Sequence, residues 1–311
     1  MVNKLLAILA AAGLLAAAAL AYTFVGRPLP VGPAPAFEIP VANPPPQMRL
    51  SALHAGKMFA RAAFAYRGGA FGEERVFGMG AILVQHPKGN LLFDAGFGRD
   101  VDAHVRTIPW LAQKTSRHEK ETPVAEQLQR AGIALPSLAG VVLTHAHWDH
   151  ASGLQDLPGV PVWVTQEEKD LVDGGDPMTA LARRLGTQHY QVYAFAGGPY
   201  LGFARSHDVF GDGSVVIVPA PGHTPGSVIA FIATPDGKRY ALVGDLVWQM
   251  EGIELPAERP WLARTLVDVD DESVRRHVVL MHQIAARMPG LTVVPAHDRR
   301  VWETLPALGS P

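Results

Sequence analysis

The sequence predicts an α/β domain built on mixed β-sheets, preceded by an apolar N-terminal segment that lies outside the fold. Two observations support this fold class: short apolar runs typical of strands alternate with helical patterns, and an Asp-Gly turn joins two of the runs. A third observation concerns function, because several of the runs end in His or Asp. With 311 residues, the chain has room for one large domain and a short extension.

The composition is that of a globular domain and limits its chemistry. Hydrophobic residues make up 48% of the chain and charged residues 18%, which allows a sizeable core and excludes global disorder. The formal net charge of −2 provides no general attraction to nucleic acid or to anionic membranes. The chain has no cysteine, so disulfides, thiolate metal sites and iron–sulfur clusters are excluded. Any metal site must therefore use His and carboxylate ligands.

Residues 1–25 have the layout of an export segment. Lys4 is the only charged residue before Arg27, and the run from Leu5 to Val25 consists of apolar and small residues. Ala19–Ala21 offers a cleavage site, yet the run approaches the length that spans a bilayer. A cleaved signal peptide and a retained membrane anchor both stay open. Either one places the domain outside the cytoplasm, in the periplasm or at the membrane, because Lys4 favours the inner side.

Prolines dominate the next segment, residues 26–50, and forbid a helix there. The composition predicts an extended, semi-rigid tether, with an ordered strap over the domain as the alternative. The main domain is expected to begin between Met48 and Val76 and is assigned to residues 51–311.

Eight apolar runs bounded by turn residues predict strands. They are Met79–Gln85, Leu91–Asp94, Val141–Thr144, Val160–Thr165, Val215–Pro219, Ser227–Ala233, Arg239–Gly244 and Leu291–Pro295. Pro235–Gly237 predicts a hairpin between two of them, because Asp-Gly supplies the positive φ that tight turns require.

Helical patterns cover about Pro123–Ala131, Thr179–Leu185 and Glu272–Met288. The last has Asp270 or Asp271 as a candidate N-cap and ends before Pro289-Gly290. Helices interspersed with strands and hairpins favour mixed sheets over a purely parallel one.

The strand-like runs end in imidazole and carboxyl groups, where a rigid sheet normally brings binding groups together. These groups are Asp94, the cluster His145-Ala146-His147-Trp148-Asp149-His150, and then His223, Asp245 and His297. Imidazole and carboxylate without sulfur suit hard or borderline divalent metals. The set exceeds what one tetrahedral ion can use, so two ions that share one carboxylate are the economical interpretation.

The stretch T-H-A-H-W-D-H-A-S-G from Thr144, followed by His223, Asp245 and His297 and preceded by Asp94, resembles the metallo-β-lactamase-fold hydrolase superfamily. The resemblance covers about Val76 to Trp302. It implies an αββα sandwich of two mixed sheets flanked by helices, with the metals in a groove at one edge.

The resemblance also implies a role for each ligand-type residue. One metal ion is held by His145, His147 and His223, and the other by Asp149, His150 and His297. Asp245 bridges the two ions, and Asp94 supports the ligand loop from behind. Zn²⁺ is the favoured metal, with Fe, Mn, Co and Ni as alternatives.

Within the superfamily, Asp245 argues against the true β-lactamases and resembles the branch that contains N-acyl homoserine lactonases and glyoxalase II-like thioesterases. The lactonase branch often has Tyr three positions after this Asp, where the present chain has Trp248. An indole N–H donates a hydrogen bond but cannot perform the proton chemistry of a phenol.

The sequence thus predicts an exported dinuclear metal hydrolase that uses a metal-bridging hydroxide to cleave lactone or carboxylic-ester bonds. Asp149 and Asp245 are its expected catalytic residues, and Trp148, Trp248 and Trp110 are candidates for the substrate pocket. A thioesterase, a phosphoester hydrolase or a non-catalytic metal-binding protein are the alternatives. The expected partner is a small ester or lactone, with no nucleic acid, membrane contact only through the N-terminal segment, and an open oligomeric state.

Overall fold

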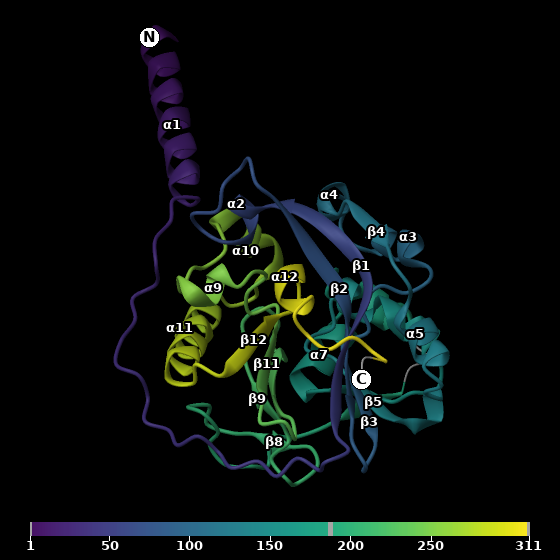
Figure 1. Cartoon of the computed structure of the whole chain (residues 1–311). Coiled ribbons are helices and arrows are strands. Elements are labelled where there is room, and N and C mark those ends of the chain that lie inside the picture. Colours follow the sequence, from purple (N-terminus) through teal and green to yellow (C-terminus); the bar gives the residue numbers. More distant parts are fainter. Residues whose placement is uncertain (1, 186–188, 310–311) are drawn as a thin grey trace.

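The computed structural model describes residues 2–185 and 189–309 and places two mixed β-sheets between layers of helices (Figure 1). The larger sheet has the order β4-β1-β2-β3-β5-β6-β7. Its strands are β1 (Arg49–Arg61), β2 (Glu74–Gln85), β3 (Asn90–Phe93), β4 (His118–Lys120), β5 (Leu138–Val142), β6 (Val162–Val164) and β7 (Tyr190–Val192). The pairs β1–β2 and β2–β3 are antiparallel, whereas β3, β5, β6 and β7 run parallel.

The smaller sheet has the order β12-β11-β10-β9-β8. Its strands are β8 (His207–Asp208), β9 (Val215–Pro219), β10 (Val228–Ala233), β11 (Arg239–Gly244) and β12 (Leu291–Pro295). Only β11 and β12 pair in parallel. The fold class predicted from the sequence, an αββα sandwich of two mixed sheets, is confirmed.

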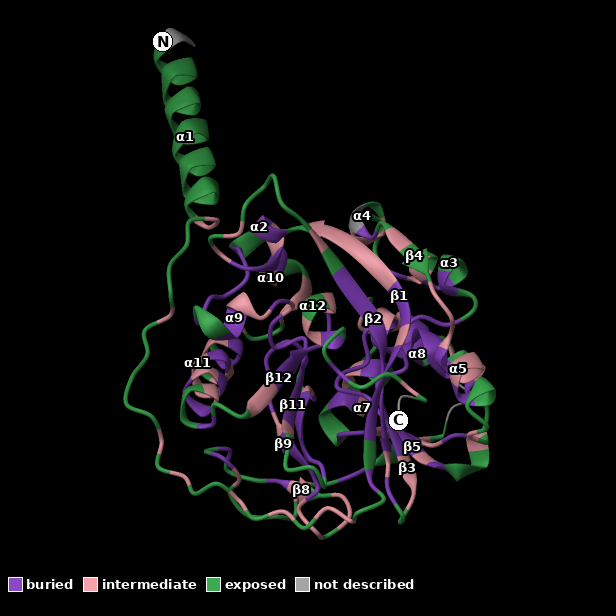
Figure 2. Cartoon of the chain, in the orientation of Figure 1, coloured by how far each residue is buried: buried purple, intermediate pink, exposed green. Residues whose placement is uncertain are grey.

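Three buried clusters define the layers. Leu50, Val84 and Phe93 of the larger sheet meet Ile217 and Leu242 of the smaller sheet in the central cluster. A second cluster lies between the larger sheet and helices α5 (Val124–Arg130), α7 (Gln166–Gly174) and α8 (Ala180–Arg184). A third lies under helix α11 (Asp271–Arg287). Burial coloured on the ribbon shows the same division, with buried strands inside and exposed helix faces outside (Figure 2).

The helices of the described residues are mostly short and lie in the connections between strands. The longer ones are α5 (Val124–Arg130), α7 (Gln166–Gly174), α10 (Trp261–Val267) and α11 (Asp271–Arg287). The shorter ones are α2 (Ala62–Ala65), α3 (Val101–His104), α4 (Trp110–Thr115), α6 (Trp148–Ala151), α8 (Ala180–Arg184), α9 (Glu251–Glu254) and α12 (Arg299–Trp302). Three 3₁₀ turns complete them, at Val105–Thr107, Leu135–Ser137 and Ser152–Asp156.

Most predicted elements are present with small changes at their ends. Strands β9, β11 and β12 have the predicted bounds, and Asp270 caps α11 by accepting from the backbone N–H groups of Glu272 and Ser273. The run predicted as Val141–Thr144 starts three residues earlier, at Leu138, and ends at Val142 because Thr144 turns to bond the Asp94 carboxylate. The predicted hairpin joins β10 to β11, with Gly237 at a φ of 82°.

Strand β1 was not predicted, although it has 13 residues. Both of its faces are largely buried along the first half, so the alternation of apolar and polar residues that marks a half-buried strand is missing. Ala52, Ala55 and Ala60 also lower its apparent β propensity. Pairing with β2 along nearly its whole length makes it a strand in spite of this local signal.

The N-terminal segment forms helix α1 (Val2–Tyr22), which projects from the domain with residues 4–22 exposed (Figures 1 and 2). Its Lys4–Tyr22 part is long and apolar enough to cross a membrane.

The proline-rich segment that follows lies against the domain. Gln283 donates to the Gly32 carbonyl (2.8 Å), and Arg287 donates to the carbonyls of Pro35 and Phe37 (3.0 Å each). Arg239 donates to the Pro40 carbonyl at 2.9 Å. Residues 26–47 are therefore an ordered strap, the alternative to the tether that the composition favours.

Candidate metal centre

The loop after β5 carries four of the ligand-type residues, and the Asp94 side chain holds it in shape. One Asp94 carboxylate oxygen accepts from the Thr144 backbone N–H (2.7 Å), and the other accepts from the Thr144 hydroxyl (2.9 Å) and from His150 Nδ1 (2.8 Å). Asp94 itself has a φ of 58°, which ends β3 and turns the carboxylate toward the loop. Two neighbouring parallel strands thus deliver the loop and its support to one place.

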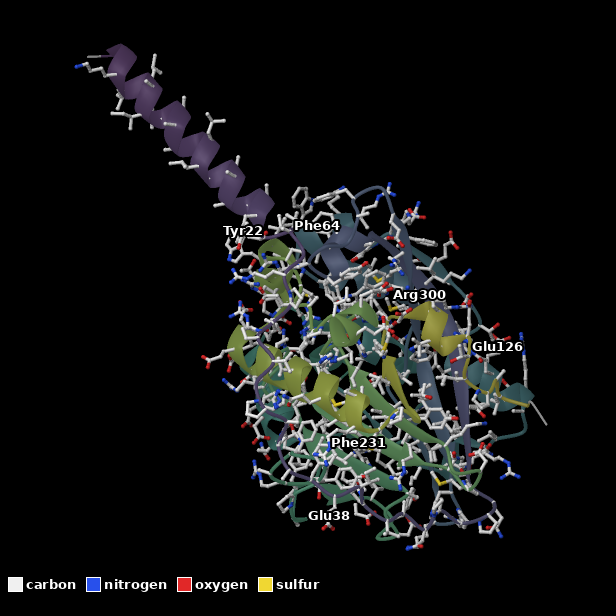
Figure 3. The ribbon with its side chains drawn as sticks, turned by 60° about the vertical axis from the view of Figure 1, so that its left-hand side comes forward. Tyr22, Glu38, Phe64, Glu126, Phe231 and Arg300 are labelled. Atoms are coloured by element: carbon white, nitrogen blue, oxygen red, sulfur yellow. The ribbon has the colours of Figure 1, made fainter. Side chains whose placement is uncertain are left out.

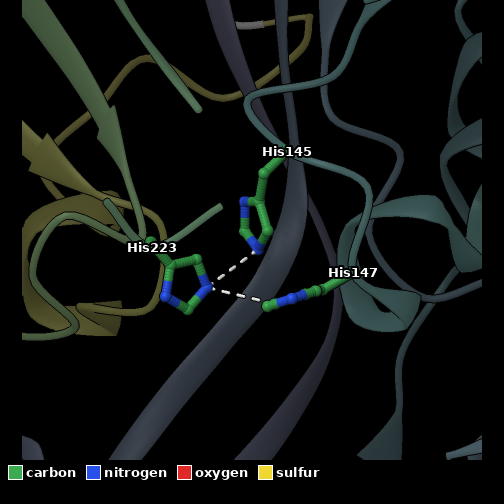
Figure 4. A group of neighbouring side chains, drawn as sticks. All are labelled: His145, His147 and His223. Carbon is green, nitrogen blue, oxygen red and sulfur yellow. Dashed lines mark hydrogen bonds between the residues drawn. The ribbon is translucent and has the colours of Figure 1, made fainter. Parts of the chain in front are cut away.

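His145, His147 and His223 point their ring nitrogens at a common position (Figure 4). His223 Nε2 lies 3.2 Å from His145 Nε2 and 3.1 Å from His147 Nδ1. All three side chains are buried, and burial, reinforced by the neighbouring imidazoles, lowers the pKa of His145 and His147 well below the usual value. The neutral imidazole is the form that binds metal ions.

Asp149, His150 and His297 form a second group, in which the ligand atoms lie within 4.8 Å of one another. Asp245 lies between the two groups. Its Oδ1 is 3.3 Å from His150 Nε2 and 3.0 Å from His297 Nε2, whereas its Oδ2 is 3.5 Å from His223 Nε2. The carboxylate therefore turns one oxygen toward each group, and the structure brings together all seven side chains that the sequence singled out.

The residues present fit a pair of divalent cations. Among the described residues, the buried atoms His150 Nε2 and Asp245 Oδ1 have no hydrogen-bond partner, although both face the cluster. Buried polar atoms without partners are costly, and a cation between them would satisfy both. Nitrogen and oxygen donors without sulfur suit zinc and other borderline divalent ions.

The charges in the cluster are strongly coupled. Burial opposes a charge on His150 and His297, but the nearby carboxylates, Asp245 among them, outweigh it and raise the pKa of both imidazoles. Burial likewise opposes the Asp245 carboxylate, yet the two imidazoles outweigh it and hold its pKa well below the usual value. A carboxylate that stays ionised at neutral pH is ready to bind cations.

Two residues behind His223 carry no sequence motif and were missed by sequence reasoning. Asp268 accepts a hydrogen bond from His223 Nδ1 at 2.8 Å, which leaves Nε2 free to face the cluster. Arg259 pairs with Asp268 and also donates to the Asp245 backbone carbonyl at 2.9 Å. Asp268 follows His223 by 45 residues, a spacing that no local pattern reveals.

Glu168 was also missed, because it fits a simpler interpretation. Thr165 and Glu168 have the spacing of a capping box at the start of α7, and Thr165 does cap this helix. The buried Glu168 carboxylate instead accepts from Ala146 N (2.6 Å), Thr224 Oγ1 (2.6 Å) and Gly226 N (3.1 Å). It thereby fastens the loop of His145 and His147 to the loop of His223.

The three tryptophans predicted for the substrate pocket lie in different surroundings. Trp148 is 3% exposed and stacks on Phe97. Trp248 directs its indole N–H to Asp245 Oδ2 at 2.8 Å, and its ring packs against Phe77 and the Arg259 guanidinium. Trp110 lies on α4 and is 68% exposed, so it lies on the surface of the molecule.

The fold and the site define the class of protein. Residues 81–297 match the metallo-beta-lactamase superfamily, and the chain belongs to this superfamily. This membership supports a metal-dependent hydrolase.

Relatives and solved structures agree with this assignment. The chain is 27% identical to a probable metallo-hydrolase, Rv2300c, of Mycobacterium tuberculosis over 71% of this chain and 75% of that protein. It is 25% identical to the N-acyl homoserine lactonase AttM of Rhizobium johnstonii over 71% of this chain and 82% of that protein. A quorum-quenching N-acyl homoserine lactone lactonase shares the fold, with a TM-score of 0.63, 17% identity, and coverage of 83% of this chain and 95% of that one.

Proposed function

We propose that this protein is an exported dinuclear metal-dependent hydrolase that cleaves lactone or carboxylic-ester bonds. The observation that carries the proposal is the placement of Asp245, with one oxygen toward each of two ligand groups. A single-ion binding protein has no need for a carboxylate between two clusters, whereas hydrolases that use two ions share a ligand in this way.

When bound, two divalent cations would supply an acidified water and an electrophile for a carbonyl oxygen. His145, His147 and His223 would hold one ion, and Asp149, His150 and His297 the other. Asp149 is the least buried of these side chains, at 14% exposure. It is therefore the residue best placed to meet a substrate and to hold the proton of the departing hydroxyl group.

The ester or lactone preference rests on the relatives, several of which are N-acyl homoserine lactonases. The Trp248 indole donates to Asp245, so in this chain it would orient the shared carboxylate and transfer no proton to the substrate. Export rests on α1, whose length, apolar composition and position suit a signal or an anchor.

The test is a purified full-length protein of measured metal content, assayed side by side on lactones, aryl esters, thioesters, phosphodiesters and β-lactams. We expect turnover of lactones or esters. A preference for thioesters or phosphodiesters would reassign the substrate, and the absence of any turnover in the metal-loaded protein would favour a non-catalytic role.

We also expect His147→Ala and Asp245→Ala each to abolish hydrolysis while circular dichroism shows a folded chain. Lys238→Ala, an exposed substitution near the β10–β11 hairpin, serves as a control that keeps full activity. Turnover that survives in either site variant would contradict the proposed chemistry.

A further inference from the structure

Helix α1 is fastened to the domain at its last turn. Arg67 donates to the Tyr22 carbonyl (3.0 Å) and to the Val25 carbonyl (3.1 Å), and the Gly68 N–H donates to the Phe24 carbonyl (2.9 Å). The Phe24 ring also packs against Phe64 and Phe71, with centroids 5.6 and 5.0 Å apart. Tyr22 and Phe64 lie together at the base of the helix (Figure 3). The helix therefore meets the domain without a flexible linker.

The same junction is close to the metal centre. Arg67 pairs with Glu258 through its side chain (3.1 Å), and its backbone N–H donates to the Glu258 carbonyl (2.9 Å). The next residue, Arg259, bonds the Asp245 carbonyl and the carboxylate of Asp268, which holds His223. Only a few contacts separate the base of α1 from the ligands.

Exposed apolar side chains gather at this end of the molecule. The connections that follow β3 and β11 lead away from Asp94 and Asp245, and they carry helices α4 and α10. Figure 1 shows both helices at the end of the domain from which α1 leaves, together with the loop between α2 and β2. These segments expose six large side chains, which we call the apolar rim: Phe71 (57%), Trp110 (68%), Leu111 (48%), Trp261 (47%), Leu262 (37%) and Leu266 (51%).

A lipid bilayer is the partner that fits both features. The Lys4–Tyr22 helix has a mean hydropathy of 2.3 and no buried residues in its apolar window, so in water it would expose an entirely apolar cylinder. At 1.5 Å per residue it extends about 28 Å, close to the roughly 30 Å of a hydrocarbon core. Trp side chains, such as Trp110 and Trp261 of the apolar rim, are enriched at the membrane–water interface.

We propose that α1 stays attached as an anchor and that the apolar rim rests on the outer surface of the same bilayer, so that the metal centre faces the membrane. The strap along α11 returns the chain to β1 without lifting the domain away from the anchor. We extend this to the substrate, on the basis of the proposed function: the enzyme takes amphiphilic esters or lactones whose acyl chain is dissolved in the bilayer.

The absence of native cysteine makes a direct test simple. Single nitroxide labels are placed on Phe71→Cys, Trp110→Cys and Leu266→Cys in the full chain, reconstituted in phosphatidylethanolamine and phosphatidylglycerol vesicles. Val41→Cys and Val192→Cys are the controls, and both residues are exposed. Asn43, two residues after Val41, donates to the Asp212 carbonyl, and Tyr193, next to Val192, packs on His207 of β8. Figure 1 shows β8 at the end of the domain opposite α1. We expect the three rim labels to collide more with lipid-soluble oxygen than with a water-soluble nickel complex, and the controls to show the opposite.

If the rim labels are as accessible to the nickel complex as the control labels are, the proposed docking on the bilayer is overturned. A chain isolated from cells that begins at Tyr22 would also overturn it, because the anchor would then have been removed. Neither readout depends on catalysis, so both stand apart from the proposed function.

The preference for substrates dissolved in the bilayer is tested separately in the same vesicles. The variant carrying Phe71→Ser, Trp110→Ser and Leu266→Ser should turn over a short-chain, water-soluble ester as the wild type does. Its turnover of a long-chain homologue should fall several-fold. Equal turnover of the long-chain ester by the variant and the wild type would overturn the proposed substrate preference. If the wild type cleaves neither ester, the proposed ester hydrolysis fails, while the labelling result still decides the docking.

Discussion

Three imidazoles of the cluster are held on their outer side by a hydrogen bond at Nδ1. His150 bonds to Asp94, His223 to Asp268, and His297 to the Gly78 carbonyl. Because Nδ1 of each ring is engaged on the outer side, Nε2 faces the cluster. These supports fix the orientation of the rings before any ion binds.

Asp268 is the residue whose role is easiest to isolate. Asp268→Asn removes the charge that holds both His223 and Arg259, and supports of this kind are typically worth about 10–100-fold in metal affinity. We expect a loss in this range, measured by competition with a chelator. Asp173→Asn, on the exposed end of α7, is the matched control and should bind as the wild type does. Unchanged affinity in Asp268→Asn would show that the ring needs no support.

At the scale of secondary-structure elements, the site depends on contacts that join one connection to another. Glu168 ties the loop after β5 to the loop after β9, and Gly226 is required there because a Cβ atom would lie 2.4 Å from the Glu168 backbone. Glu258 plays a similar part, since it pairs with Arg67, Arg264 and Arg275 and so joins α10 and α11 to the base of α1.

Glu168→Gln should destabilise the fold. An amide has one acceptor oxygen, so at least one of the three buried donors loses its partner, which typically costs about 1–3 kcal/mol. Urea denaturation measures the difference. Glu167→Gln changes the exposed neighbour and should leave the free energy of unfolding unchanged. A Glu168→Gln chain as stable as this control would contradict the assigned role.

The surroundings of Glu258 predict how the stability of the fold depends on pH. Burial alone would raise the pKa of its carboxyl group, but the guanidinium groups of Arg275, Arg264 and Arg67 outweigh burial and lower it. A lowered pKa in the folded state stabilises the fold above the ordinary value of about 4.3, and this stabilisation is lost as the pH falls through the folded-state pKa.

The stability difference between wild type and Glu258→Gln should therefore be constant near neutral pH and shrink in acid, below about pH 4. Urea denaturation at several pH values measures it, with the exposed Glu254→Gln as the control. A difference that grows toward acid pH would show that the sign of the pKa shift is wrong.

At the scale of the whole molecule, the cluster draws on both sheets, so binding of cations couples to folding. His145 and His150 follow a strand of the larger sheet, whereas His223, Asp245 and His297 follow strands of the smaller one. Ligand binding to the folded state alone stabilises it by an amount that grows with ligand concentration, about 4 kcal/mol at a thousandfold excess over the dissociation constant.

Removal of metal by a chelator should thus lower the melting temperature of the wild type, and added Zn²⁺ should restore it. Calorimetry of Asp245→Ala should show a much smaller response to either treatment, because the shared ligand is gone. An equal response in both proteins would place the bound metal elsewhere.

The seven ligand-type residues of the cluster could be singled out in the sequence because they follow apolar runs that are recognisable on their own. The spacing of His145, His147 and His150 is local, and the strand ends before Asp245 and His297 are equally local features. The supports could not be predicted, because Asp268 and Arg259 act across long sequence distances and Glu168 looks like a helix cap. Strand β1 could not be predicted for the same reason, because pairing with β2 and not its own sequence pattern makes it a strand.

The amino-acid sequence by itself determined the α/β class with mixed sheets, because hydrophobic periodicity and turn chemistry record short-range order directly. It also determined the seven ligand-type side chains, whose motif carries the resemblance to the superfamily. Tertiary structure alone decided that the Asp268 carboxylate lies behind His223 and that the Glu168 carboxylate lies between two loops. It also decided that the proline-rich segment is a strap and that the base of α1 is fastened to the domain. Such arrangements arise when buried polar groups from distant segments must find partners, and a sequence pattern carries no record of that pairing.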